Sequence, residues 1–134
     1  MSAAVPAASE TPPIARILAV IETEDDDGAS HVPMLKAAAD QATRHGARLD
    51  LLACLRPPPD LAAIARATGQ TPAECLSALA DQRRREMSDL AAEARPEAVP
   101  EVKVSIGNPF IEVIAEVTRS DVDLVVKAAR PLSG

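Results

Sequence analysis

The chain has 134 residues and a formal net charge of −6, with 47% hydrophobic but only 1% aromatic residues. This length suits a single domain with its own core, which has to be built from aliphatic side chains. The acidic balance disfavours nucleic acid and anionic membranes as partners, and the lack of aromatic rings disfavours base stacking. No segment resembles a signal peptide or supplies the roughly 18 consecutive apolar residues of a membrane helix, so we expect a soluble cytoplasmic protein.

The first part of the chain alternates between strand and helix patterns. Residues 1–13, rich in Ala, Pro and Ser, predict a disordered tail before a single domain over residues 14–134. The apolar run 17–21 is typical of a strand buried on both faces, and an acidic loop follows it. A helix is then expected, with Pro33 in its first turn and Gly46 as its left-handed cap.

The middle of the chain combines a second strand with two helices. Residues 48–55 predict the strand, and the three prolines after it predict an extended loop. Asp60 is expected to cap a short helix over residues 61–68. A Thr/Glu capping box in residues 71–74 starts a long helix that we expect to end near Ala94. The apolar face of this long helix is predicted to carry Leu76, Leu79, Met87, Leu90 and Ala94.

The last part predicts two more strands around one helix. Residues 101–106 alternate between apolar and polar side chains, which is typical of an edge strand with one wet face. Gly107 and Pro109 then turn the chain into a helix that Asn108 can cap. Residues 124–126 predict a fourth buried strand. We expect the helix to direct inward the side chains of Phe110, Val113, Ile114 and Val117.

Strands that alternate with helices predict right-handed βαβ units. The expected fold class is therefore α/β, with an open, mostly parallel sheet and helices on both faces. In such sheets ligands bind at the carboxyl ends of the strands, where the strand order reverses. The candidates for a ligand crevice at these ends are Glu22, Thr23, Arg56, Gly107, Asn108, Pro109 and Lys127.

Residues 102–129, VKVSIGNPFIEVIAEVTRSDVDLVVKAA, resemble the universal stress proteins, whose domains carry a strand, a G-x-P turn, a helix with an inward Ile, and D-L-V-V. Here these features are Gly107, Pro109, Ile114 and residues 123–126. The segments ARILAVIE and ARLDLLACL are similar to the first and second strands of that family. The long helical region and the lysine of DLVVK most resemble the first domain of the tandem-domain members, which lack ATP-binding motifs.

The resemblance implies a sheet in the order 3-2-1-4-5, a dimer along the fifth strand and, in many members, bound ATP or AMP. A glycine-rich loop after the fourth strand holds that nucleotide, and Ala128 and Pro131 stand here at its first two glycine positions. Glu22 stands where the family has an aspartate. Since the sequence stops at Gly134, the resemblance implies a domain truncated after the fourth strand, with the fifth strand absent.

Other polar residues have simpler interpretations. Five carboxylates in residues 22–27 could bind a divalent metal or a Mg-nucleotide, but the spacing of a calcium loop is missing and a solvated acidic loop is favoured. His45 is interpreted as a cation near a helix end, and His31 falls in a predicted loop without a role. Cys54 and Cys75 are interpreted as buried free thiols rather than a disulfide. The sequence therefore predicts neither a metal site nor an enzyme.

Two functions remain open. The first is a stress-response domain that acts as a non-catalytic oligomerisation or partner-binding module, without bound nucleotide. The alternative is an ATP- or AMP-binding regulatory domain. We expect a homodimer through the fourth strand, because an apolar strand without a neighbour is a template for another chain. That predicted dimer edge consists of Leu124, Val125 and Val126.

Overall fold

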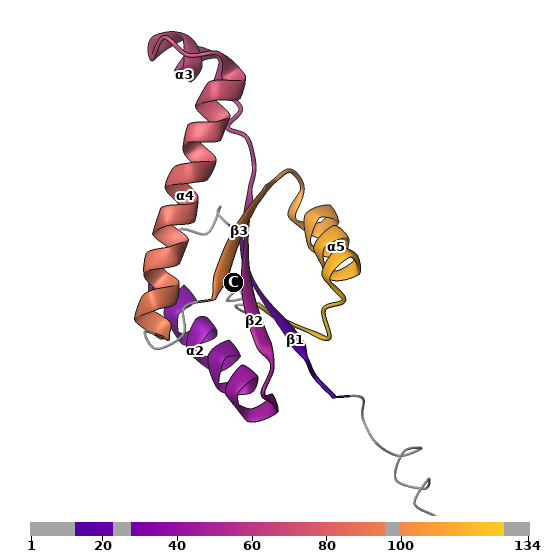
Figure 1. The fold of residues 1–134 in the computed structure, drawn as a ribbon. Coiled ribbons are helices and arrows are strands. Elements are labelled where there is room, and N and C mark those ends of the chain that lie inside the picture. The colour runs from indigo at the N-terminus through magenta and orange to yellow at the C-terminus, as the bar shows by residue number, and fades with distance from the viewer. Residues whose placement is uncertain (1–12, 23–27, 96–99, 128–134) are drawn as a thin grey trace, which may run out of the picture.

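The structure, a computed structural model, describes residues 13–22, 28–95 and 100–127. The predicted tail up to residue 12 and the acidic residues 23–27, including Thr23, lie outside the described residues. Figure 1 shows the strands and helices in chain order. They are β1 (Arg16–Glu22), α2 (Gly28–His45), β2 (Arg48–Leu55), α3 (Leu61–Ala67), α4 (Pro72–Ala94), β3 (Glu101–Ile106), α5 (Pro109–Ser120) and β4 (Leu124–Lys127).

The described strands form one parallel sheet in the order β3-β2-β1-β4. Helices α2 and α4 lie on one face of this sheet, and α5 lies on the other (Figure 1). The open parallel α/β fold with helices on both faces is therefore confirmed, as is the edge position of the 101–106 strand. No described helix is long and apolar enough to cross a membrane.

Each face of the sheet has its own apolar core. The core under α2 and α4 contains alternate residues of β1 and β2 together with small and medium side chains of the two helices, such as Leu35 and Met87. The core under α5 is smaller and consists of Leu18, Val20, Leu52 and Cys54, with Val113, Val117 and Val122 packed against it. Both faces of β1 and β2 are covered, which explains why continuous apolar runs predicted these two strands correctly.

Local signals placed most helix ends correctly. The side-chain oxygen of Thr71 accepts from the N–H of Glu74 at 3.1 Å, and the Glu74 carboxylate accepts from the N–H of Thr71 at 2.8 Å. This capping box begins α4 as predicted. Gly46 has a φ of 62° after α2, which is the expected left-handed cap. Asp60 precedes α3, but its side chain makes no capping hydrogen bond, so that prediction was wrong.

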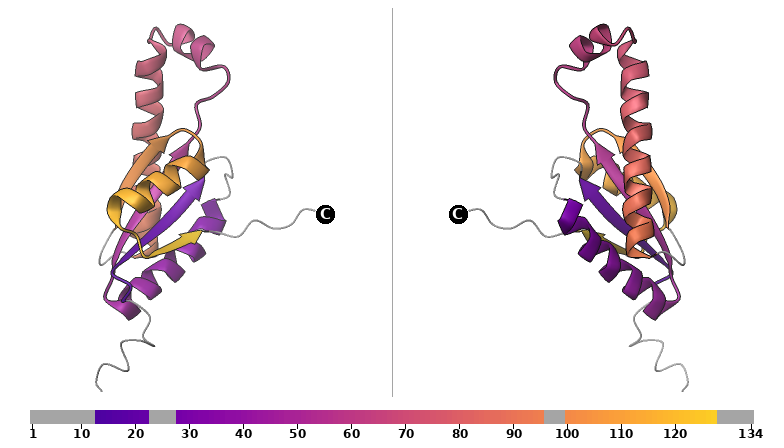
Figure 2. Two further views of the ribbon diagram at one scale, coloured as in Figure 1. Left: turned by 90° about the vertical axis from the view of Figure 1, so that its right-hand side faces the viewer. Right: turned by 90° about the vertical axis from the view of Figure 1, so that its left-hand side faces the viewer.

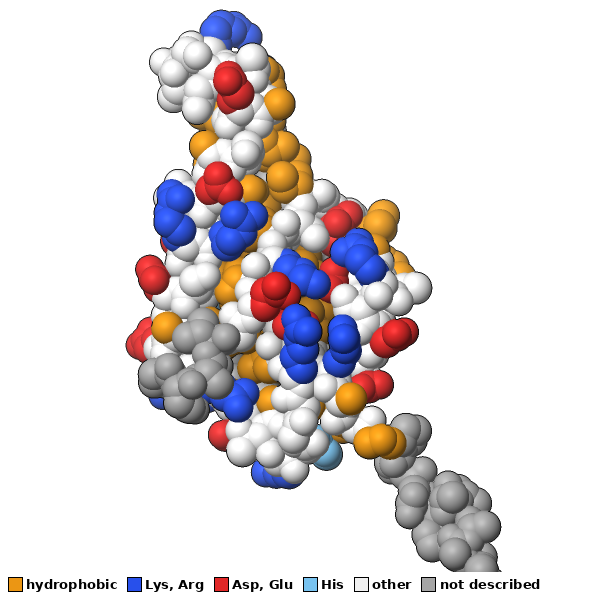
Figure 3. Space-filling model, viewed as in Figure 1, with side chains coloured by type: hydrophobic (Ala, Val, Ile, Leu, Met, Phe, Trp, Pro, Cys, Tyr) orange, Lys and Arg blue, Asp and Glu red, His pale blue; other side chains and the backbone are white. Residues whose placement is uncertain are grey.

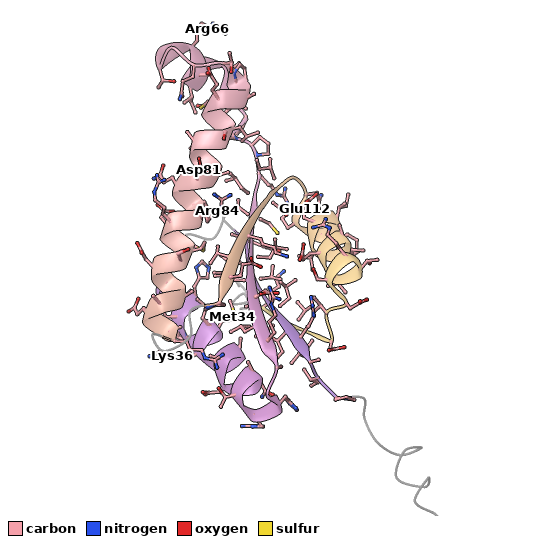
Figure 4. The ribbon with its side chains drawn as sticks, viewed as in Figure 1. Met34, Lys36, Arg66, Asp81, Arg84 and Glu112 are labelled. Atoms are coloured by element: carbon pink, nitrogen blue, oxygen red, sulfur yellow. The ribbon has the colours of Figure 1, made fainter. Side chains whose placement is uncertain are left out.

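Helix α2 begins earlier than predicted. It starts at Gly28, five residues before Pro33, which lies inside the helix. Pro33 is the sixth residue of the helix, beyond the first four N–H groups that lack a partner, so the helix forgoes one backbone hydrogen bond there. As a result His31 belongs to the helix and is buried rather than lying in a loop. Figure 4 shows Met34 of the same helix beside the sheet.

The set of α5 side chains that face the sheet differs from the prediction. Val113 and Val117 pack on the sheet as expected, but Phe110 is 74% exposed and Ile114 is 51% exposed. Both of these inward assignments were wrong, and with them the inward Ile implied by the family resemblance.

The predicted apolar face of α4 is confirmed at Met87, which is buried, and at Leu90 and Ala94, which pack against the same core. Leu76 and Leu79 are only partly buried, and the unpredicted Cys75, Ala80 and Ala91 are buried.

Candidate functional site

The carboxyl ends of β1 and β4 meet at the point where the strand order reverses. The chain proceeds from β1 to β2 and β3 on one side and then crosses to β4 on the other side of β1. The crevice at such a reversal is the usual ligand site of an open parallel sheet. The candidate site therefore lies around the last residues of β1 and β4.

A salt bridge occupies this position. The Lys127 ammonium at the end of β4 donates to Oε1 of Glu22 at the end of β1, at 2.7 Å. The Glu22 side chain is 17% exposed and that of Lys127 50% exposed. The pair links the two strands across the reversal point, and the carboxylate and the ammonium are each other's partners.

The turn from β3 to α5 forms the second side of the site. The N–H of Gly107 donates to the carbonyl of Leu55 at 3.0 Å, and its φ of 146° is one that L residues rarely adopt. Asn108 caps α5, since its side-chain oxygen accepts from the N–H of Phe110 at 2.9 Å. Pro109, at the first helical position, is buried. The predicted turn and cap are confirmed.

Glu112 was not predicted as a site residue. Its Oε2 lies 3.0 Å from the position that a Cβ on Gly107 would take, so the carboxylate lies against the turn (Figure 4). One feature of the sequence could have pointed to it, namely its spacing from Asn108. Glu112 is four residues after the cap, and its backbone N–H donates to the Asn108 carbonyl. One turn of helix therefore returns its side chain to the turn.

The thiol of Cys54 lies between these two sides of the site, and the charges on both sides affect its pKa. It is paired in register with Glu22 and with Ser105, and it is 1% exposed. Burial, and to a smaller extent the carboxylates of Glu22 and Glu112, raise the pKa of the Cys54 thiol to about 11. Lys127 acts in the opposite direction but does not compensate. Cys54 and Cys75 are both free and buried, as predicted, and the Cys54 thiol is a poor nucleophile.

The structure thus places five of the predicted residues at or just after the carboxyl ends of the strands. They are Glu22, Gly107, Asn108, Pro109 and Lys127. Arg56 follows the end of β2 and is exposed. Thr23 and the other carboxylates of the acidic segment lie outside the described residues. Among the described His, Cys, Asp and Glu side chains, no group of three or more could hold a metal ion.

A parallel sheet with helices on both faces and a reversal of strand order beside β1 defines the class of open, doubly wound α/β domains. Within that class, residues 14–134 match the universal stress protein family. The chain belongs to this family, because the match covers nearly all of it. No curated protein matches the sequence significantly.

Solved structures have the same fold. The universal stress protein UspA from Lactobacillus plantarum is 21% identical, with a TM-score of 0.62, over 92% of this chain and 83% of that one. A universal stress protein family member from Burkholderia pseudomallei is 18% identical, with a TM-score of 0.61, over 90% of this chain and 85% of that one. A universal stress protein in complex with cAMP is 17% identical, with a TM-score of 0.51, over 85% of this chain and 71% of that one.

Proposed function

We propose that this chain is a cytoplasmic stress-response domain that acts as a non-catalytic module. In this proposal it binds a second copy of itself at β4 and carries no nucleotide. The likeness to the first domain of tandem-domain members belongs to the same proposal. The observation that carries it is the pair of carboxylates, Glu22 and Glu112, near Cys54 at the carboxyl ends of the strands.

The carboxyl ends of the strands are unfavourable for a phosphate group. Glu112 lies against Gly107 at the start of α5, where the helix N-terminus would otherwise offer its N–H groups to an anion. Glu22 adds a second carboxylate, and the ammonium of Lys127 is already hydrogen-bonded to it. Two carboxylates that face one site repel a nucleotide phosphate unless a cation lies between them. The charges of the described residues therefore support a domain without bound ATP or AMP.

β4 is suited to binding another strand. The carbonyl of Ala15 accepts from the N–H of Arg48, so alternate residues of β1 bond to β2 and the others bond to β4. In the observed register Leu124 and Val126 then bond to β1, and Val125 directs its N–H and C=O to the outer edge. Of the described strands none pairs with that edge. An unpaired edge of this kind is a template for a second chain.

A thermal-shift measurement tests the absence of a nucleotide. The chain is heated with Mg-ATP, Mg-AMP and cAMP up to millimolar concentration, and we expect the melting temperature to stay within one degree of the value without ligand. A true site would stabilise the fold by about 2.7 kcal/mol at a ligand concentration of 100 Kd. Glu112→Gln serves as the companion variant, since a shift that occurs only in this variant identifies the carboxylate as the obstacle. A clear shift of the unaltered chain would overturn the proposal.

The alternative is an ATP- or AMP-binding regulatory domain, and one observation favours it. A solved structure with the same fold is a universal stress protein in complex with cAMP. In the alternative, a magnesium ion between Glu22 and the phosphates would reverse the repulsion. The Mg-ATP sample distinguishes the two functions, because omission of Mg²⁺ would then abolish the shift.

A further inference from the structure

Helix α3 and the first half of α4 extend past the carboxyl ends of the strands (Figure 1 and Figure 2). We call residues 56–82, from the end of β2 to the middle of α4, the arm. Helix α3 packs mainly on α4, and this contact involves neither α5 nor β4. The second half of α4 differs, because Met87 and Ala91 pack in the core on the sheet. The arm is therefore a part of the fold that lies beyond the sheet rather than on it.

Small side chains form the interior of the arm. Its buried residues are Ala65 of α3 and Cys75 and Ala80 of α4, and none of them belongs to either core of the sheet. The larger apolar side chains of the two helices are only partly buried here, and they are Leu61, Ile64, Leu76 and Leu79. The core under α2 and α4, in contrast, contains buried isoleucine, leucine and methionine side chains. Because burial stabilises in proportion to apolar area, the arm gains much less from packing than the sheet does.

Local hydrogen bonds hold α4 at its start, but α3 depends on its contact with α4. The capping box of Thr71 and Glu74 fixes the first turn of α4. Helix α3 has seven residues, and the Asp60 side chain makes no capping hydrogen bond to it. Isolated helices shorter than about 12 residues are marginal in water. Loss of the few buried contacts between the two helices would therefore release α3 and the first half of α4 together.

Leu55, the last residue of β2, lies at the foot of the arm. It is 8% exposed, although it belongs to neither core. Alternation along β2 places its side chain on the same face as Leu51 and Ala53, which is the face that α4 covers. Helix α4 contacts β2 and runs down this face from the arm (Figure 1). The middle of α4 therefore covers the carboxyl end of β2.

We propose that the arm opens as a unit while the sheet stays folded, and that this opening uncovers Leu55 at the carboxyl end of β2. Parts of a fold with little buried apolar area open at a lower free energy than the whole, and lids and binding segments come from such parts. The arm is in this sense a lid beside the candidate site. Its opening needs neither a bound nucleotide nor a second copy, so it goes beyond the proposed function.

The two thiols report on the arm and on the sheet separately, because Cys75 lies in the arm and Cys54 in the core under α5. A thiol reagent reaches a buried cysteine only when the structure around it opens. Cys54→Ala and Cys75→Ala give chains with one thiol each, which are labelled at pH 8 with Ellman's reagent. Each labelling rate is divided by that of the same chain in denaturant. We expect Cys75 to label at least roughly a hundred-fold faster than Cys54.

A variant of the sheet core separates local from global opening. Ile17→Val, at a buried position of β1, should speed the labelling of Cys54 about five-fold and leave that of Cys75 unchanged, because the arm opens without the sheet. Thr71→Ala removes the cap of α4 and should speed the labelling of Cys75 about five-fold. Thr43→Ala, at an exposed position of α2, is the matched control and should change neither rate. Circular dichroism verifies that each variant is folded.

Other results would overturn the proposal. If Ile17→Val speeds the labelling of Cys75 as much as that of Cys54, the arm unfolds only together with the sheet. If Cys75 in the folded chain labels at the rate of the unfolded chain, the arm is never closed. Leu55→Cys, in a chain with both native thiols replaced by alanine, should label at the rate of Cys75. Labelling at the rate of Cys54 would show that the arm does not cover β2.

Discussion

Removal of the Glu116 charge should loosen the contact between α5 and the sheet. The Glu116 side chain is 2% exposed, and three groups donate to its carboxylate. Oε2 accepts from Lys103 Nζ at 2.9 Å and from Ser120 Oγ at 2.6 Å, and Oε1 accepts from the Arg119 guanidinium at 2.7 Å. Figure 3 shows basic and acidic side chains close together on the face between α4 and α5. One buried carboxylate thus ties α5 to β3.

The expected loss of stability depends on how well water replaces the hydrogen bonds that Lys103 and Arg119 lose. Glu116→Gln keeps the size of the side chain but removes its charge, and a hydrogen bond to a charged group contributes about 1.5–3 kcal/mol. The Lys103 and Arg119 side chains are 37% and 65% exposed, so water compensates both in the variant. We therefore expect a net loss of about 2 kcal/mol, or a melting temperature lower by roughly 6–10 °C for a domain of this size.

The pKa of Glu116 determines how its contribution to the stability of the fold changes with pH. Burial alone would raise the pKa of Glu116, but the hydrogen bonds from Ser120 and Lys103 and the charges of Lys103 and Arg119 together hold the pKa below its ordinary value of 4.5. Because the folded pKa lies below the unfolded one, the carboxylate contributes fully above pH 4.5 and loses its contribution as the pH falls through the folded value.

Urea unfolding followed by circular dichroism, at pH 7 and in steps to pH 3, measures this effect. The gap between the unaltered chain and Glu116→Gln should narrow as the pH falls. Glu93→Gln, at an exposed position of α4, should match the unaltered chain. A double-mutant cycle with Lys103→Met should give a coupling energy of about 1 kcal/mol. Equal stability of Glu116→Gln and the unaltered chain at pH 7 would refute the reasoning.

Three further outcomes are expected. Cys54, whose pKa is raised to about 11, should not react with a thiol reagent at pH 8 until the chain is unfolded, and rapid labelling of the native chain would contradict the burial. The Asp123 carboxylate accepts from two N–H groups at the start of β1, and these hydrogen bonds lower its pKa. It should therefore stabilise the fold at pH 7 and less so in acid, and Asp123→Asn should lower the melting temperature only above the pKa of Asp123 in the folded chain. Val117→Asp should unfold the domain at a cost of several kcal/mol, whereas Ile114→Asp should stay folded, and equal circular-dichroism melts would show that α5 is rotated.

Much of the fold could be predicted from the sequence because its signals are local. The apolar run of β2 has the predicted ends, since a strand covered on both faces needs apolar residues throughout and the prolines stop it. The capping box fixed the start of α4 in the same way. At the site, Glu22 and Lys127 were predicted from their positions at strand ends, and their salt bridge follows from the parallel register of β1 and β4.

The facing of α5 could not be predicted, because the helix is apolar on more than one side. Phe110 and Ile114 satisfy a 3.6-residue repeat as well as Val113 and Val117 do. What decides between them is the buried position of Glu116, which depends on Lys103 of a different element. A rule that places apolar residues inside and charged residues outside fails at such a helix. The same failure hid Glu112, whose role depends on the turn that its side chain meets.

The two parts of the proposed function rest on different elements. Glu112 lies against Gly107 at the start of α5 and repels a phosphate, while β4 offers its edge to a second copy. No residue belongs to both features. Glu112→Gln should therefore change the response to nucleotide without changing the dimer, and Val125→Pro should do the reverse, with sedimentation velocity and circular dichroism as the measurements of assembly and fold. If either variant altered both properties, α5 and β4 would be coupled, and the domain would be a ligand-controlled assembly rather than a nucleotide-independent one.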